Sequence, residues 1–250
     1  MRIISRIDVK NEYVIKGIHL EGLRKLGDPN LIAKKYYNQG IDEIIFMDAV
    51  AAYYNRNSLS ALIEKACEDI FVPITVGGGI RKIEDIQMAL NSGADKTAIN
   101  TAAVKKPDFI KEACEVFGSQ CIISSIDVLK KGDKKWEVYI DNGREPTGID
   151  AVDWAKKVEK LGAGEIMLTS IDKEGTKKGF DIELNKKISE VVKIPIISCG
   201  GAGSCNDIAN LIEGSNIDAV GLASILHYEL HTVQSIKEFL SNEKYVNLRL

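Results

Sequence analysis

The stretch GIDEIIFMD, residues 40–48, decides the fold, because it contains a short apolar run that directly follows a helical pattern. In that helical pattern, residues 31–38, apolar side chains recur at three-and-four spacing. The same pair of patterns repeats along the whole chain. We expect strands at residues 3–8, 43–48, 74–76, 96–100, 121–127, 165–169, 194–198 and 219–222. The helical patterns are residues 31–38, 59–68, 83–91, 108–117, 149–161, 182–192, 206–213 and 233–240.

This alternation of strand and helix is typical of parallel βα units. Eight units in 250 residues average about 31 residues each, the usual size in a closed (β/α)8 barrel. An open doubly wound sheet is the competing arrangement, but it usually has fewer strands. No Pro/Ser-rich linker or low-complexity tract divides the chain. We therefore predict an α/β protein with a single (β/α)8 TIM barrel over residues 1–250, and a charged hairpin at residues 130–143 behind the fifth strand.

The two halves of the chain echo each other at a nearly constant offset. Ile7-Asp8-Val9 recurs 119 residues later as Ile126-Asp127-Val128. Further echoes in the same order join residues 40–44 to 162–166, 77–79 to 200–203, and 93–95 to 216–218. If these echoes arose only because barrel strands resemble one another, they would recur at the spacing of one βα unit instead of four. We therefore predict a duplicated half-barrel, roughly residues 1–119 and 120–250.

Composition argues against several classes of function. Lys and Arg number 33 against 36 Asp and Glu, so the net charge of −3 lacks the basic excess of a nucleic-acid-binding protein. No run approaches the ~18 unbroken apolar residues of a membrane span, and the start shows no signal peptide. The five cysteines form no CxxC pair, which argues against a disulfide scaffold or a zinc site and favours a reducing cytoplasm.

Two carboxylates stand at the ends of opposite strands of the expected barrel. Asp8 ends the first strand and Asp127 the fifth. Reactive groups of such barrels lie at the carboxyl ends of strands, so both acids would face one mouth. This is the arrangement that a general acid and a general base require. The alternative is that each Asp merely caps a following loop or helix, but two at symmetry-related positions favour a catalytic pair.

Glycine-rich turns follow the third and seventh strands. In Gly77-Gly78-Gly79 and in residues 200–203, backbone N–H groups can converge on an anion beside a helix start. A single glycine turn is weak evidence, because glycine also ends ordinary helices. Two matched turns predict two phosphate sites and an elongated, doubly phosphorylated substrate. The candidate binding residues are Lys16, Gly78, Gly79, Asn100, Thr101, Asp172, Gly175, Thr176, Gly200, Gly201 and Ser224.

Together these motifs resemble the cyclase subunit of imidazole glycerol phosphate synthase. The resemblance spans essentially the whole chain and is carried by residues 7–9, 14–17, 23–24, 27–29, 75–80, 93–96, 99–103, 117–120, 162–170, 172, 175–176 and 200–203. It implies a cytoplasmic lyase of histidine biosynthesis that needs no cofactor and no metal. Such an enzyme joins ammonia to a phosphoribulosyl carboxamide-ribotide and yields imidazole glycerol phosphate and aminoimidazole carboxamide ribotide. It implies that Asp8 and Asp127 are the acid–base pair.

The resemblance also implies a partner, because this chain shows no glutaminase site of its own. A separate glutaminase subunit would supply ammonia and form a heterodimer on the amino-terminal face of the barrel. No nucleic acid or membrane is expected as a partner. The resemblance assigns Arg2, Glu43, Lys96 and Glu165 to a charged gate where ammonia enters.

Two features depart from the family pattern. Arg6 stands where the family has a cysteine, on the same strand face as Asp8. A guanidinium there would hold Asp8 ionised and narrow the ammonia path. The loop at residues 19–24 lacks the usual aromatic residue. Two alternatives therefore stay open: a paralogue that acts with a glutaminase subunit in amidation of a surface-glycan sugar, and a non-catalytic ammonia conduit.

Overall fold

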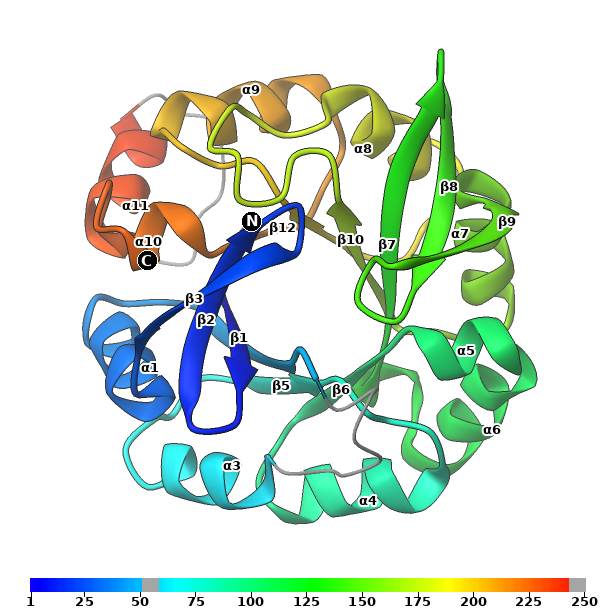
Figure 1. Ribbon diagram of the computed structural model, residues 1–250, viewed down its shortest axis with the longest axis horizontal. Coiled ribbons are helices and arrows are strands. Elements are labelled where there is room, and N and C mark those ends of the chain that lie inside the picture. Colours follow the sequence, from blue (N-terminus) through cyan, green and yellow to red (C-terminus); the bar gives the residue numbers. More distant parts are fainter. Residues whose placement is uncertain (51–58, 243–250) are drawn as a thin grey trace.

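A closed barrel of eight parallel strands forms the centre of the computed structural model, which describes residues 1–50 and 59–242 (Figure 1). The barrel strands are β1 (Arg2–Lys10), β4 (Glu43–Asp48), β5 (Ile74–Gly77), β6 (Lys96–Ile99), β7 (Ile122–Gly132), β10 (Glu165–Ser170), β11 (Ile196–Cys199) and β12 (Ala219–Leu222). The pairings of β12 with β1 and of β10 with β7 complete the ring. The predicted (β/α)8 barrel is confirmed, and each barrel strand overlaps an expected apolar run.

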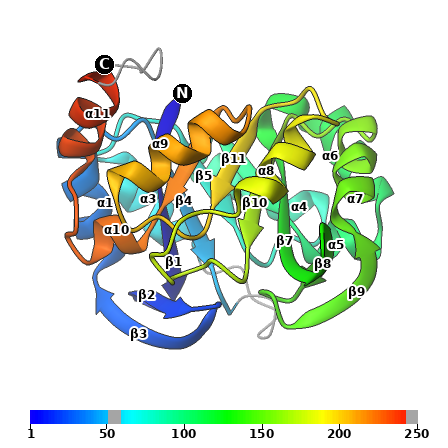
Figure 2. The ribbon, with the colours of Figure 1, turned by 90° about the horizontal axis from the view of Figure 1, so that it is seen from above.

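Helices form a layer around the outside of the barrel (Figures 1 and 2). They are α1 (Pro29–Asn38), α3 (Ser60–Cys67), α4 (Ile83–Asn91), α5 (Thr101–Lys105), α6 (Asp108–Phe117), α7 (Ala151–Lys160), α8 (Ile182–Ser189), α9 (Cys205–Gly214), α10 (Ser224–His227) and α11 (Val233–Asn242), with the 3-10 turn η1 (Ser119–Cys121). The helical pattern did not predict α5 and α10, because five and four residues are too few to show a period. Within the described ranges, the helices are too short or too polar to cross a membrane.

Two antiparallel additions lie at the carboxyl end of the barrel (Figure 2). After β1 the chain forms a hairpin from β2 (Tyr13–Ile18) and β3 (Glu21–Gly27), and after β7 it adds β8 (Lys135–Ile140) and β9 (Glu145–Asp150). The hairpin of β7 and β8 was predicted. The first hairpin was not, because its turn places His19 and Leu20 at φ +53° and +63°, where side chains of these types are uncommon.

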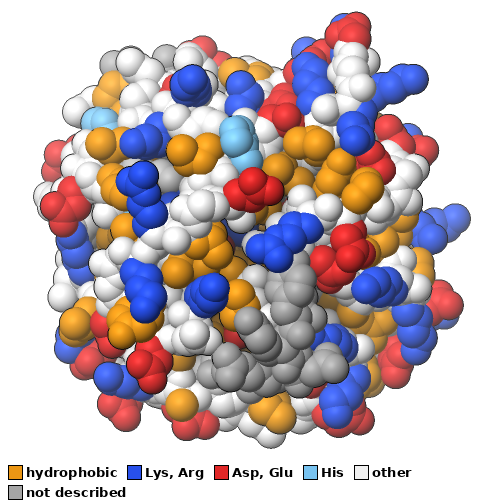
Figure 3. All heavy atoms as spheres, in the orientation of Figure 1, with side chains coloured by type: hydrophobic (Ala, Val, Ile, Leu, Met, Phe, Trp, Pro, Cys, Tyr) orange, Lys and Arg blue, Asp and Glu red, His pale blue; other side chains and the backbone are white. Residues whose placement is uncertain are grey.

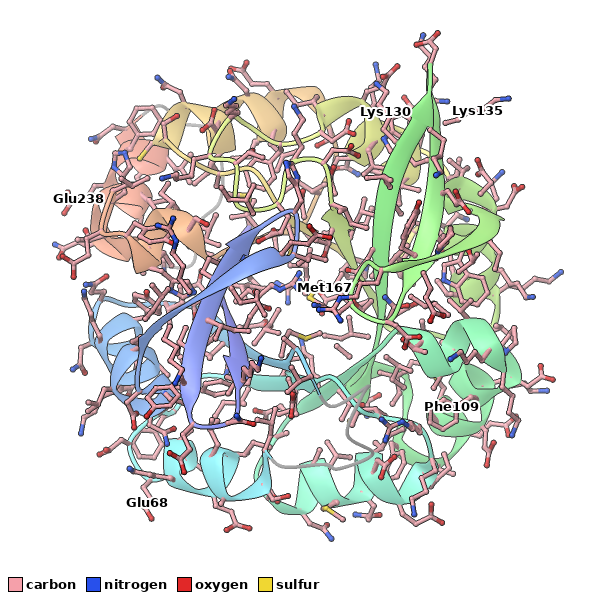
Figure 4. The ribbon with its side chains drawn as sticks, in the orientation of Figure 1. Glu68, Phe109, Lys130, Lys135, Met167 and Glu238 are labelled. Atoms are coloured by element: carbon pink, nitrogen blue, oxygen red, sulfur yellow. The ribbon has the colours of Figure 1, made fainter. Side chains whose placement is uncertain are left out.

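The barrel interior is layered, because alternate side chains of each strand point inward. An apolar layer contains Ile4 of β1, Ile123 of β7 and Met167 of β10, which lies at the centre of the barrel in Figure 4. Two residues further along β1 and β7 come Arg6 and Ser125, and two further again come the predicted acids. The apolar layer therefore forms a floor beneath a polar interior at the carboxyl end.

Backbone geometry repeats between the two halves. Lys82 and Ser204, the N-caps of α4 and α9, have φ/ψ of −146°/164° and −145°/165°. Asn100 and Ala223, which precede α5 and α10, share the unusual values −118°/−86° and −131°/−82°. These matches support the predicted half-barrel repeat, whose boundary near residue 119 stays a prediction.

Candidate active site

Asp8 and Asp127 end up at the same mouth of the barrel, as predicted, and both carboxyls are buried. Arg6 links their surroundings. Its Nε donates a hydrogen bond to Asp8 Oδ1 at 3.0 Å, and its Nη1 donates to Thr169 Oγ1 at 2.9 Å. Thr169 lies opposite Asp127 in the pairing of β7 with β10. The Arg6 guanidinium therefore reaches from one acid across the barrel to the strand beside the other.

The two acids have opposite electrostatic environments. Burial raises the pKa of Asp8, but the Arg6 guanidinium and the Lys16 ammonium outweigh burial and lower that pKa to about 2. For Asp127 burial prevails, and its pKa is raised above the usual value although the Arg6 guanidinium and the hydrogen bond from Asn100 Nδ2 to Asp127 Oδ2, at 2.9 Å, act to lower it. Two carboxyls whose pKa values are pushed apart can serve as a fixed anion and a proton carrier.

Lys16 and Glu174 close one side of the mouth. Lys16 Nζ lies 3.3 Å from Asp8 Oδ2 and also forms an ion pair with Glu174, in the loop after β10. The hairpin that carries Lys16 docks on this loop, where His19 N donates to Glu174 O at 2.8 Å. A Cβ on Gly175 would lie 2.2 Å from a backbone oxygen of the hairpin, so only glycine permits this contact. The hairpin is therefore fastened over the mouth.

A cavity of about 320 Å³ opens against the first glycine turn. Its lining includes the predicted residues Gly78, Gly79, Asn100, Thr101 and Asp127, together with Arg6, Arg81, Lys105 and Lys106. Lys and Arg side chains gather around the centre of this face, which is viewed in Figure 3. The cavity thus combines the acid of raised pKa, a backbone turn suited to an anion, and cationic side chains.

The second glycine turn encloses far less space. Gly175, Gly200, Gly201 and Ser224 line a cavity of about 10 Å³, which is room for about one water molecule. Glu174 is among the residues that line it. The turn has the expected backbone, with positive φ at both glycines. A phosphate at this turn stays a prediction, and it requires the Glu174 carboxylate to move away.

Four charged residues meet at the amino-terminal end of the barrel, as expected. Arg2 Nη1 lies 2.7 Å from Glu43 Oε1, and Arg2 also pairs with Glu165. Lys96 Nζ lies 3.2 Å from both Glu43 Oε2 and Glu165 Oε2. Each cation contacts both anions, so the four side chains form a ring of alternating charge.

Comparison with known proteins agrees with this architecture. A family model described as histidine biosynthesis protein matches residues 2–232. The chain belongs to this histidine biosynthesis family. A similar protein is the imidazole glycerol phosphate synthase subunit HisF of Legionella pneumophila, 54% identical over 207 residues, which are 83% of this chain and 98% of that relative. The resemblance inferred from the motifs is confirmed, and the surface-sugar alternative is not favoured.

Four of the predicted catalytic and substrate-binding residues of this family member line neither cavity: Asp8 and Lys16, which line a separate cavity of about 10 Å³, and Asp172 and Thr176. Asp172 Oδ2 accepts a hydrogen bond from Lys130 N at 2.7 Å, and Thr176 Oγ1 donates to Lys173 O at 2.7 Å. Their contacts hold the loop after β10 in place, and their contact with substrate stays a prediction. Conversely, the sequence did not indicate Glu174, because nothing along the chain shows that it pairs with a lysine 158 residues away.

The close approach at the first glycine turn can be tested by comparing Gly78→Ala with Gly40→Ala. Both glycines have positive φ, +91° and +82°, which costs alanine about 1–2 kcal/mol at either site. A Cβ at Gly78 would also lie 2.3 Å from Asp48 O, whereas one at Gly40 meets nothing within 4 Å. We expect Gly78→Ala to lose clearly more free energy of unfolding in urea. Equal losses would contradict the close approach.

Proposed function

We propose that this chain is the cyclase subunit of an imidazole glycerol phosphate synthase, acting as an ammonia-dependent lyase. The observation that carries the proposal is the pair Asp8 and Asp127, held at one mouth with opposite pKa shifts beside an anion cradle. The similarity to the HisF subunit of Legionella pneumophila supports the same activity. The substrate that we propose is a phosphoribulosyl carboxamide-ribotide with two phosphates, and the reaction uses no cofactor.

The side chains suit the proton transfers that this reaction requires. Attack of ammonia on a carbonyl moves a proton from nitrogen to oxygen, and loss of water and release of the amine need further proton transfers. Asp127 lines the open cavity. It is therefore placed to exchange protons with a bound substrate. Asp8, a fixed anion, stabilises positive charge that develops on nitrogen.

The test of this proposal is turnover by the purified chain. The carboxamide-ribotide is supplied with an ammonium salt at alkaline pH, where free ammonia is present, and loss of substrate absorbance is followed. We expect release of both products, detected by chromatography. Absence of turnover while the substrate binds would reject the cyclase and favour a non-catalytic conduit.

A glutaminase subunit at the amino-terminal face is the proposed partner, and we place the complex in the cytoplasm, where the five free cysteines would stay reduced.

Phe71 lies directly before β5, at the same end of the barrel as the ring of Arg2, Glu43, Lys96 and Glu165. Its side chain is 77% exposed, and its ring contacts that of Tyr37 at 6.3 Å between centroids. An exposed aromatic side chain at the same end of the barrel as these paired charges suits an interface anchor.

Phe71→Glu is expected to lower glutamine-dependent turnover at least tenfold, because loss of an interface anchor weakens binding of the partner subunit by about that factor or more. Ammonium-dependent turnover should be unchanged, because Phe71 lies at the end of the barrel opposite the acids. The measurement compares both nitrogen sources in the presence of the glutaminase subunit. Leu31→Glu is the matched control, since Leu31 is 71% exposed but lies in the first turn of α1, away from that face. If both variants respond alike, this docking face is excluded.

A further inference from the structure

Arg6 has no counterpart in the second half of the barrel. The offset of 119 residues that relates Asp8 to Asp127 places Ser125 at the equivalent position. Arg6 and Ser125 are both buried, 3% and 2% exposed, one step below their acids. Arg6 makes the two hydrogen bonds given above, whereas Ser125 Oγ has no hydrogen-bond partner among the described residues. The repeat is thus broken directly below the two acids, where one half of the barrel has a guanidinium and the other a hydroxyl.

The ionisable groups around Arg6 come from six different segments at the mouth. They are Asp8 of β1, Lys16 of β2, Asp127 of β7, Glu174 of the loop after β10, Cys199 of β11 and His227 of α10. Burial raises the pKa of Cys199 to about 12. Burial, with a contribution from Lys16, lowers the pKa of His227 to about 4. Both groups are therefore uncharged at neutral pH.

The two cations and two other anions of this cluster have a net charge of zero without any contribution from Asp127. Arg6 and Lys16 are its cations, and Asp8 and Glu174 are the anions in direct contact with them. A buried cation is best compensated by an anion that it touches. Arg6 also acts to lower the pKa of Asp127, but only Asp8 accepts a hydrogen bond from it, so the larger share of the compensation goes to Asp8.

We propose that Arg6 is a positioning residue that makes the two acids unequal, holding Asp8 as a fixed anion and leaving Asp127 to carry the proton. The role of Arg6 in catalysis rests on the proposed cyclase function. The arrangement of charges around Arg6, in contrast, is present in the chain without substrate. Arg6 also lines both cavities, so a ligand gripped at both glycine turns would pass directly over the guanidinium.

The test is a carboxyl titration of the free protein, by NMR of protein labelled with ¹³C in the aspartate carboxyls. Asp8→Asn and Asp127→Asn assign the two signals. In Arg6→Met, which keeps much of the volume but removes the charge, we expect the gap between the two titration midpoints to narrow by more than about one pH unit. Ser125→Ala, the control at the symmetry-related position, should keep the wild-type gap. An unchanged gap in folded Arg6→Met would overturn the proposal.

Two further variants keep the test decisive. Arg6→Lys retains the charge and should restore most of the gap, so a collapsed gap in this variant would also count against the proposal. If Arg6→Met does not fold, Arg6→Gln replaces it, since it keeps a donor for Asp8 without the charge. With substrate, the acidic limb of kcat/KM should move to higher pH in the uncharged variant. Failure of the wild-type chain to turn over substrate rejects the cyclase, while the NMR titration still decides the role of Arg6.

Discussion

Asp127→Asn is expected to lower the kcat of the ammonium-dependent reaction about 10²–10⁴-fold, the usual contribution of a general acid–base group. Asn keeps the shape and still reaches Asn100, but it cannot exchange a proton.

Burial raises the pKa of Asp127 in the folded state, so ionisation of this carboxyl costs stability as pH rises through that pKa. At neutral pH the variant should therefore be as stable as the wild type or slightly more stable. Substrate absorbance gives kcat, and urea unfolding gives the free energy of unfolding.

The control for this prediction is Asp133→Asn, at the exposed tip of the hairpin of β7 and β8. It removes the same charge far from the cavity and should leave kcat unchanged. A folded Asp127→Asn protein that keeps wild-type kcat would contradict the acid–base assignment. That result is what a non-catalytic conduit predicts, since a conduit depends on its interfaces and not on Asp127.

Sequence patterns predicted the features that depend on periodicity and repetition. The barrel strands were visible because each buries a short apolar run, and Asp8 and Asp127 were visible because they end two such runs at a constant offset. The same register brings the first glycine turn, Asn100 and Asp127 to one cavity. The ring at the amino-terminal end was found only through the resemblance, because charged residues at strand starts otherwise show no pattern.

The features that escaped prediction depend on contacts between distant segments. The second glycine turn matches the first in sequence and in φ, yet its cavity, which the Glu174 side chain helps to line, is only about 10 Å³. That carboxylate is held there by Lys16, and the pair could not be inferred from residues so far apart in the chain. Arg6 was expected to contact Asp8 because strand side chains alternate, but its hydrogen bond to Thr169 depends on the shape of the closed barrel.

The free energy of unfolding of the protein should depend on Asp8 far more than on Asp127. Asp8→Asn is expected to cost about 3–5 kcal/mol in free energy of unfolding, because it leaves Arg6 and Lys16 with one anion in direct contact, Glu174. Asp28→Asn is the matched control. Asp28 Oδ1 accepts from Leu31 N at the start of α1, and asparagine caps a helix about as well as aspartate. The measurement is urea unfolding at pH 7 for both variants.

The pH dependence gives the same prediction an independent check. The pKa of Asp8 is lowered from 3.8 to about 2 on folding, so its ionisation stabilises the fold fully above pH 4, and this contribution is lost as pH falls toward 2. The shift corresponds to about 2 kcal/mol at 1.4 kcal/mol per pH unit. Asp8→Asn should remove this part of the acid dependence, whereas Asp127→Asn should keep it. If Asp8→Asn unfolds with the wild-type acid profile, or if the two variants are equally stable at pH 7, the two acids are equivalent after all. In that case the guanidinium beneath Asp8 does not separate their roles.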